Sequence, residues 1–130
     1  MEKNERKELD HIFFDRVDII TQAINRRCFL GINDSEFHFA LYEKGSYYKK
    51  HRDAFENDDS RKISVVLYLN KNWKEEDGGE LMIYSEENLK VEPRAGTLVI
   101  FESHLEHEVL ESRKDRISIT GWLKNVRKIL

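Results

Sequence analysis

The chain has 130 residues, of which 39% are hydrophobic and 36% are charged, and its formal net charge is −3 at pH 7. This length suits one domain, and the mixed charge lacks the basic excess of a nucleic-acid-binding face, so we expect no nucleic-acid partner. No apolar run reaches the roughly 20 residues that cross a bilayer, and the charged N-terminus is unlike a secretory signal, so no membrane partner is expected. The single cysteine, Cys28, fits a cytoplasmic location, and we expect its side chain to be buried.

The N-terminal part of the chain predicts one helix, which we place within residues 1–35. Apolar residues recur there every three or four positions, as in an amphipathic helix, at Leu9, Ile12, Phe13, Val17, Ile20 and Ile24. Gly31 and the pair Asn33-Asp34 then break the pattern.

From Glu36 onward the apolar period changes to two, which is typical of strands. We expect strands at residues 37–42, 48–51, 63–69, 80–85, 89–92, 97–101, 107–111 and 116–123. Frequent turn residues separate these segments. One supporting helix followed by a strand-rich domain at 36–130 predicts a mainly β fold of the sandwich or jelly-roll type.

His51, Asp53 and His107 are candidate metal ligands. Residues two apart on an extended strand point to the same side, so His51 and Asp53 can reach one ion. With His107 they match the two-histidine, one-carboxylate ligand set of non-haem Fe(II) oxygenases. A structural zinc site would typically use several cysteines, and this chain has one.

Other interpretations of the histidines remain open at this level. A His-x-Asp pair alone is equally compatible with a surface ion pair. His104 is the rival distal ligand, but His107 begins the strand-like run and is preferred. His11 lies on the predicted helix, and His38 is expected to be a packed residue behind the site, so neither is expected to bind metal.

The last predicted strand carries a second signal. Arg116, Ser118, Thr120 and Trp122 share one face of it. An arginine that faces a protein interior is costly unless an anion pairs with it, and a dicarboxylate would bind guanidinium in a bidentate fork. Tyr68 is a candidate hydroxyl donor to the same carboxylate. The alternatives are a solvent-facing strand surface for the arginine and core packing for the tyrosine.

Several short segments together resemble one enzyme family in their order and spacing. They are the stretch 42–53 with Tyr-x-x-Gly and His-x-Asp, Tyr68-Leu69-Asn70 with Trp73, Gly78-Gly79-Glu80-Leu81, 95–101, His107-Glu108-Val109 and 116–122. This series resembles the prolyl-4-hydroxylase-like 2-oxoglutarate/Fe(II)-dependent dioxygenases, most of all the HIF-prolyl-hydroxylase-type branch and its bacterial relatives. The resemblance covers residues 36–124, and the family usually carries more structure before this stretch.

The resemblance implies a double-stranded β-helix, or jelly roll, and a set of residue roles. It implies that His51, Asp53 and His107 bind Fe(II). It implies that Arg116 binds the distal carboxylate of 2-oxoglutarate, with Tyr68 and Thr120 assisting. By the same match, the pocket would be lined by Tyr42, Val66, Leu81 and Trp122.

The expected activity is O2-dependent prolyl 4-hydroxylation of a protein or peptide, with release of succinate and CO2 and with ascorbate keeping the iron reduced. Arg61 matches a position that the family often keeps basic, and with Asp58-Asp59 it is a candidate peptide contact. The alternative for that loop is an acidic, solvated turn. A free amino acid or another small molecule remains an alternative substrate, and a catalytically silent jelly-roll binding module remains an alternative function. A halogenase is disfavoured because such enzymes replace the carboxylate, here Asp53. The oligomeric state stays open.

Overall fold

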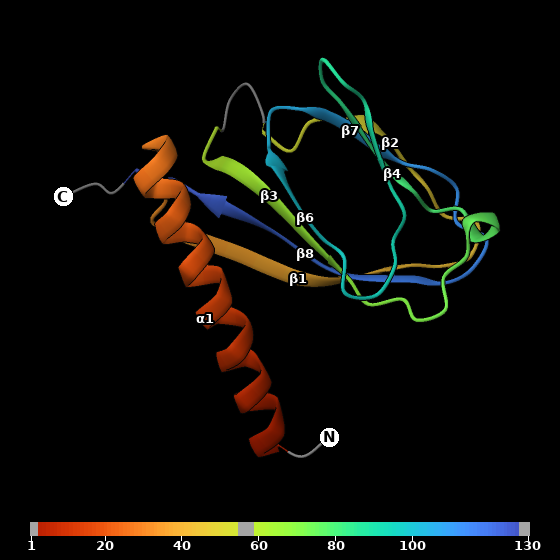
Figure 1. Ribbon diagram of the computed structural model, residues 1–130, viewed down its shortest axis with the longest axis horizontal. Helices are drawn as coiled ribbons and strands as arrows, with labels where there is room; N and C mark the ends of the chain where they lie inside the picture. Colours follow the sequence, from red (N-terminus) through yellow and green to blue (C-terminus); the bar gives the residue numbers. More distant parts are fainter. Residues whose placement is uncertain (1–2, 55–58, 128–130) are drawn as a thin grey trace. The chain divides into compact units, whose positions relative to one another are not determined.

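The computed structural model describes residues 3–54 and 59–127, which contain one α-helix, one short 3-10 helix and eight strands (Figure 1). The elements in chain order are α1 (Lys3–Cys28), β1 (Asp34–Tyr42), β2 (Tyr48–His51), β3 (Arg61–Tyr68), η1 (Glu75–Asp77), β4 (Leu81–Tyr84), β5 (Leu89–Val91), β6 (Leu98–Glu102), β7 (Glu106–Val109) and β8 (Arg116–Lys124). They form two compact units, Met1–Ile32 and Asn33–Leu130.

The first unit consists of α1 and the turn that ends it. Phe29, directly after the helix, has a φ of 54°, which is the left-handed conformation that often follows a helix C-terminus. The Asn25 side chain then holds the departing chain by accepting a hydrogen bond from the Ile32 amide and donating one to the Ile32 carbonyl, at 2.7 and 2.9 Å. Among the described residues, no helix combines the length and the apolar character that a membrane crossing requires.

The sequence-based expectation for Cys28 was wrong, because its side chain is exposed. Cys28 is the last residue of α1 and lies beyond Ile24, the last residue of the apolar stripe. Because Cys28 follows Ile24 by four residues, it continues the same helix face, but burial ends before the helix does, since residues 26–28 are all exposed.

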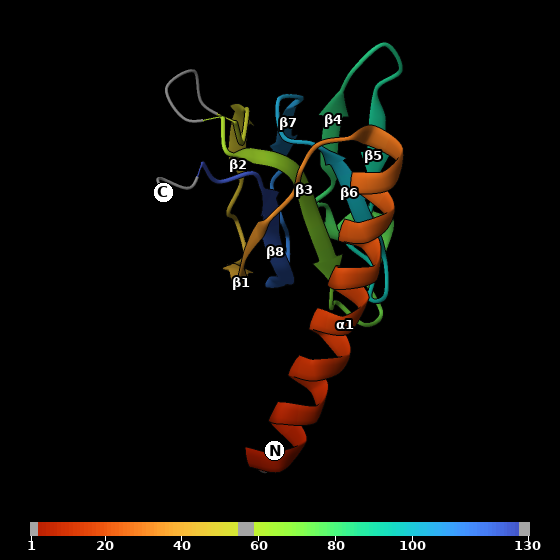
Figure 2. The same ribbon diagram turned by 90° about the vertical axis from the view of Figure 1, so that its left-hand side faces the viewer.

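The second unit is a pair of four-stranded antiparallel sheets that lie opposite each other (Figures 1 and 2). One sheet has the strand order β1-β8-β3-β6, and the other has the order β2-β7-β4-β5. This arrangement confirms the predicted mainly β jelly-roll fold. All eight predicted strands are present, but β1 begins at Asp34 and β3 at Arg61, a few residues earlier than expected. These polar ends pair through the backbone, as Asp34 does with Lys124, so no apolar pattern marks them.

The core of this unit fills the space between the two sheets. Its buried members come from β3, β4, β6 and β7 and are Val66, Tyr68, Leu81, Ile83, Val99, Phe101 and Val109. On the inward face of β3, Ser64, Val66 and Tyr68 alternate with outward residues, as the two-residue period of a strand requires. The same face therefore carries both core packing and polar groups.

Gly121 lies in β8 where this strand is flanked on both sides, opposite Phe37 of β1 and Val65 of β3. A Cβ atom at this position would lie 2.2 Å from the Glu36 carbonyl oxygen and 2.2 Å from Cδ1 of Phe37. These separations are far below van der Waals contact, so the close approach of β1 to β8 requires glycine here.

We expect Gly121→Ala to lower the free energy of unfolding by about 3 kcal/mol, the upper end of ordinary overpacking, because the nearest obstacle is a backbone oxygen. Urea denaturation measures this change. Gly96→Ala is the control, since a Cβ there meets nothing within 4 Å and the cost is limited to the φ of +85°. A loss at Gly121 no larger than the loss at Gly96 would contradict the packing argument.

Candidate active site

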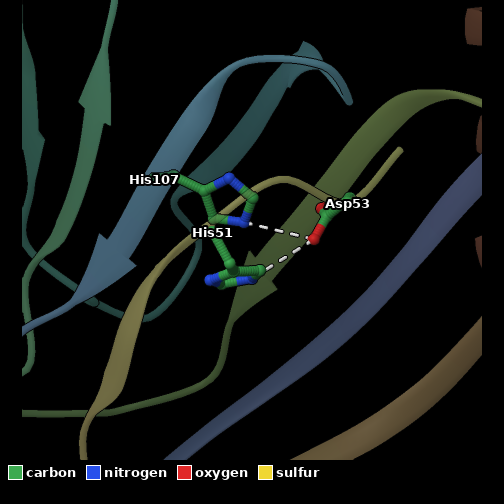
Figure 3. Close-up of side chains that lie close together, drawn as sticks. All are labelled: His51, Asp53 and His107. Atoms are coloured by element: carbon green, nitrogen blue, oxygen red, sulfur yellow. Dashed lines mark ion pairs between the residues drawn. The ribbon is translucent and has the colours of Figure 1, made fainter. Parts of the chain in front are cut away.

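His51, Asp53 and His107 converge at one point between the sheets (Figure 3). The pairing of β2 with β7 puts His51 directly opposite His107, and Asp53 follows two residues after His51. Asp53 Oδ1 lies 3.4 Å from His51 Nε2 and 3.2 Å from His107 Nε2. One ligand atom from each residue lies within 4.8 Å of the other two, which is close enough for a shared metal ion.

Backbone carbonyls fix the orientation of both imidazoles. His51 Nδ1 is 2.7 Å from the Lys49 carbonyl oxygen, and His107 Nδ1 is 3.0 Å from that of Leu105. A carbonyl oxygen accepts only, so Nδ1 carries the proton in each ring and donates it. The Nε2 atoms then face the Asp53 carboxylate, in the arrangement that protein histidines adopt toward a metal.

The electrostatics of this cluster favour a cation. Burial raises the pKa of Asp53, but hydrogen bonds from His107, His51 and Ser64 outweigh it and hold the pKa well below its usual range. Burial lowers the pKa of His107, but the hydrogen bonds to Asp53 and to the Leu105 carbonyl outweigh it and raise the pKa above its ordinary value. The ionised Asp53 carboxylate therefore faces the two imidazole Nε2 atoms, where a cation is stabilised. Two imidazole nitrogens and one carboxylate oxygen form a ligand set that suits Fe(II).

His104, the rival for the distal position, takes no part in this cluster. Its side chain is exposed, and its Nε2 lies 3.8 Å from Oε2 of Glu102. His107 instead stands in β7 with its ring 4.8 Å from that of Phe101 and is 5% exposed.

Arg116 is a buried cation whose hydrogen-bond partners in the described part of the chain are neutral. It is 3% exposed, and it donates from Nε to the Gly79 carbonyl at 2.8 Å and from Nη2 to the Tyr68 hydroxyl at 3.0 Å. Within the described part of the chain, no carboxylate forms an ion pair with it. A buried guanidinium with neutral partners alone is costly, so the arrangement suits a ligand that brings its own negative charge.

The Tyr68 hydroxyl is available to the same ligand. Burial raises the pKa of Tyr68, and the opposing effect of Arg116 is smaller, so the phenol stays protonated at neutral pH. Its oxygen accepts the hydrogen bond from Arg116, which leaves its proton to donate elsewhere. Arg116 and Tyr68 together present the donors that a carboxylate needs.

One cavity of about 370 Å³ joins the two groups, since His51, Asp53, His107 and Arg116 all line it. Six further residues predicted from the sequence also line it, namely Tyr42, Val66, Tyr68, Leu81, Thr120 and Trp122. Arg61 lines it too, with its guanidinium carbon 3.7 Å from the centre of a Trp122 ring. Asp58 lies outside the described residues, and Asp59 pairs with Lys62 at 3.6 Å.

Several residues around the cavity were not predicted as part of the site, among them Ser64 and Ser103, and His38 was expected only as a packed residue behind it. His38 lines it, 5.5 Å from Trp122 between ring centroids. Ser64 donates a hydrogen bond to Asp53 Oδ2, and Ser103 contacts Ser64. The signal for Ser64 was present in the sequence, because it is a polar residue at the same strand phase as Val66 and Tyr68. Ser103 follows a strand in a turn, and no pattern marks it.

The family model described as the 2OG-Fe(II) oxygenase superfamily matches residues 37–124, and the chain belongs to this superfamily. The members are oxidoreductases that use Fe(II), 2-oxoglutarate and O2. The match includes both the His51, Asp53 and His107 cluster and the Arg116 segment.

Several of the similar proteins are described as prolyl hydroxylases. A Pseudomonas putida prolyl-4-hydroxylase structure is 44% identical with a TM-score of 0.83, and the alignment covers 88% of this chain and 65% of that one. A Trichoplax adhaerens prolyl hydroxylase, solved with a hypoxia inducible factor peptide fragment, is 30% identical with a TM-score of 0.77, covering 86% and 54%. An uncharacterised PKHD-type hydroxylase of Synechocystis sp. is 28% identical over 113 residues, covering 72% and 37%. The chain thus spans less than two thirds of each relative's length.

We expect Asp53→Ala to abolish stable binding of a divalent metal, because it removes the anion that faces both imidazoles. Anaerobic titration of the apoprotein with Co(II), followed by its visible absorption, measures the affinity. His104→Ala is the control and should bind Co(II) as the unmodified protein does. Equal losses in the two variants would contradict the assignment.

Proposed function

We propose that this protein is a 2-oxoglutarate-dependent hydroxylase of prolyl residues within a protein or peptide, acting at carbon 4 and releasing succinate and CO2. The observation that carries the proposal is the cavity itself. A candidate metal cluster lines it, and so does a buried arginine that forms no ion pair among the described residues. The resemblance to prolyl hydroxylases supports the prolyl residue as the target.

His51, Asp53 and His107 would hold Fe(II), and Arg116 with Tyr68 would hold the distal carboxylate of 2-oxoglutarate. Fe(II) bound there supplies the O2-dependent oxidation chemistry of the superfamily. The residues of the chain supply binding and orientation. The carbonyls of Lys49 and Leu105 fix the imidazole planes, and the Gly79 carbonyl fixes the guanidinium, so the donors are in place before either partner arrives.

Apolar residues form part of the cavity wall near the proposed reaction site. Val66, Leu81, Phe101 and Val109 line it and are buried apolar residues of the core. Apolar walls around two buried charges strengthen the electrostatic interactions of a bound dicarboxylate with Arg116. They also limit side reactions of the oxidising site with solvent.

Arg61 and Trp122 are the proposed contacts for the substrate. The Arg61 side chain is partly exposed, pairs with Glu36 at 3.5 Å and lies over Trp122, so it stands between the cavity and solvent. A prolyl ring suits an aromatic surface, and a guanidinium suits the carbonyl oxygens of a peptide. The relative solved with a peptide fragment supports a peptide as the substrate class.

A library of proline-containing peptides, with free proline as a separate sample, tests the substrate class. With Fe(II), 2-oxoglutarate, O2 and ascorbate, we expect peptide-dependent succinate formation and a mass gain of one oxygen on a prolyl residue. Mass spectrometry locates the oxidised carbon, and the Asp53→Ala variant is the inactive control. Hydroxylation of free proline without any peptide product would contradict a peptide substrate. Absence of succinate with every sample would contradict the activity.

We expect Arg116→Ala to raise KM for 2-oxoglutarate about 30-fold or more, because the co-substrate carboxylate would lose its buried charged partner. Steady-state succinate formation measures this KM. Co(II) affinity should stay near that of the unmodified protein. Arg113→Ala is the matched control, since Arg113 is exposed three residues earlier and donates to the Glu76 carbonyl. An unchanged KM in Arg116→Ala would contradict the proposed role.

A further inference from the structure

Two serine hydroxyl groups lie in a hydrogen-bonded series next to the Asp53 carboxylate. Ser64 Oγ lies 2.6 Å from Asp53 Oδ2, which is the oxygen that does not face the imidazoles. Ser103 Oγ lies 2.9 Å from Ser64 Oγ. Ser64 is 1% exposed and Ser103 is 0% exposed, so the two hydroxyls meet protein groups and not solvent.

The direction of these hydrogen bonds follows from counting protons. Oδ2 is a carboxylate oxygen and accepts here, so Ser64 donates its single proton to it at 2.6 Å. Ser64 Oγ then has lone pairs and no further proton, so Ser103 is the donor in the contact between the two serines. The two hydrogen bonds therefore run in one direction, from Ser103 to Ser64 and from Ser64 to Asp53. Each hydrogen bond strengthens the next one in the series.

Ser103 also holds the backbone of the ligand segment. Its carbonyl oxygen accepts hydrogen bonds from the amides of Asp53 and Ala54, each at 3.0 Å, and its own amide donates to the Lys62 carbonyl at 3.0 Å. Asp53 follows β2 of one sheet, whereas Ser64 lies in β3 of the other. Ser103 therefore fixes the main chain of Asp53, and Ser64 fixes its side chain from the opposite sheet.

The two carboxylate oxygens of Asp53 therefore have different contacts. Oδ1 lies within 3.4 Å of both Nε2 atoms, and Oδ2 is held by a short, charge-assisted hydrogen bond. A freely rotating carboxylate is able to turn both oxygens toward a metal. With Oδ2 engaged by Ser64, the carboxylate offers one oxygen.

We propose that Ser64, supported by Ser103, is a positioning residue that makes Asp53 a one-oxygen ligand of the metal. This inference rests on the proposed metal-binding role of His51, Asp53 and His107. As in the two-histidine, one-carboxylate sites of non-haem Fe(II) oxygenases, three single-atom ligands would leave positions on the ion open to other ligands. A second carboxylate oxygen would occupy one of these positions.

Anaerobic titration of the apoprotein with Co(II) tests the proposal without any substrate. In Ser64→Ala, we expect the Co(II) dissociation constant to rise about 10- to 100-fold, as is usual when a group that orients a metal ligand is lost. The visible absorption spectrum of the bound Co(II) should also change, because Oδ2 becomes free to approach the ion. Ser64→Cys should show the same two effects, since the thiol is larger than the hydroxyl, so it leaves no space behind, but it is a weak donor.

Ser112→Ala is the matched control. Ser112 is also 0% exposed, and its hydroxyl donates to the Lys114 carbonyl at 2.5 Å and not to Asp53. Its loss should leave both the Co(II) affinity and the spectrum unchanged. Thermal unfolding of each apoprotein shows which variants are folded, and Ser64→Cys decides the question if Ser64→Ala does not fold.

The outcomes that contradict the metal site differ from those that contradict the positioning role of Ser64. Unmodified protein that binds no Co(II) would overturn the metal cluster itself and this inference with it. Unmodified protein that binds Co(II), together with a folded Ser64 variant of the same affinity and spectrum, would overturn the positioning role alone. A loss of affinity in Ser112→Ala equal to that in the Ser64 variants would also overturn it, because a general packing effect would then explain the result.

Discussion

The antiparallel pairing of β2 with β7 holds the site together, because it places His51 directly opposite His107. Side chains on a strand alternate between its two faces, so a shift of one residue in this register would turn one imidazole out of the cavity. The position of Asp53, two residues after His51, depends on the same register. The backbone carbonyls of Lys49 and Leu105, which orient the rings, belong to the same two segments of the chain.

The cavity contains two buried charges of opposite sign that do not neutralise each other. Asp53 is hydrogen-bonded to His51, His107 and Ser64, and Arg116 is hydrogen-bonded to Gly79 and Tyr68. Among the described residues, Asp53 and Arg116 form no ion pair with one another. Each group therefore suits a partner from outside the chain, a cation for the first and an anion for the second. A metal ion chelated by a dicarboxylic 2-oxo acid supplies both the cation for Asp53 and the anion for Arg116.

The two sheets contribute different parts of this arrangement. The sheet of β2, β7, β4 and β5 carries the two histidines, and the sheet of β1, β8, β3 and β6 carries Arg116, Tyr68 and Ser64. The hydrogen bond between Ser64 and Asp53 crosses from one sheet to the other. Core packing that sets the distance between the sheets, through residues such as Val66 and Leu81, therefore also sets the geometry of the site.

Local pattern was sufficient for the strands and for the residues with distinctive chemistry. The two-residue period predicted every strand, and it predicted that Arg116, Ser118, Thr120 and Trp122 share a face, because alternation is a property of any extended chain. The polar ends of β1 and β3 carry no such period, and neither does the three-residue helix η1, so pattern alone did not find them. The exposed Cys28 differs from its prediction because neither residue type nor the apolar period shows where along a helix burial ends.

By itself, the sequence determined the order of the strands along the chain, the identity of the candidate metal ligands and the presence of an arginine that faces inward. The tertiary structure decided that Arg116 has neutral protein partners, and that Ser64 and Ser103 stand behind Asp53. Serine is common in turns and strands, and nothing in its neighbours along the chain shows which distant group its hydroxyl meets. That contact joins positions 53, 64 and 103, and only the packing of two sheets brings them together.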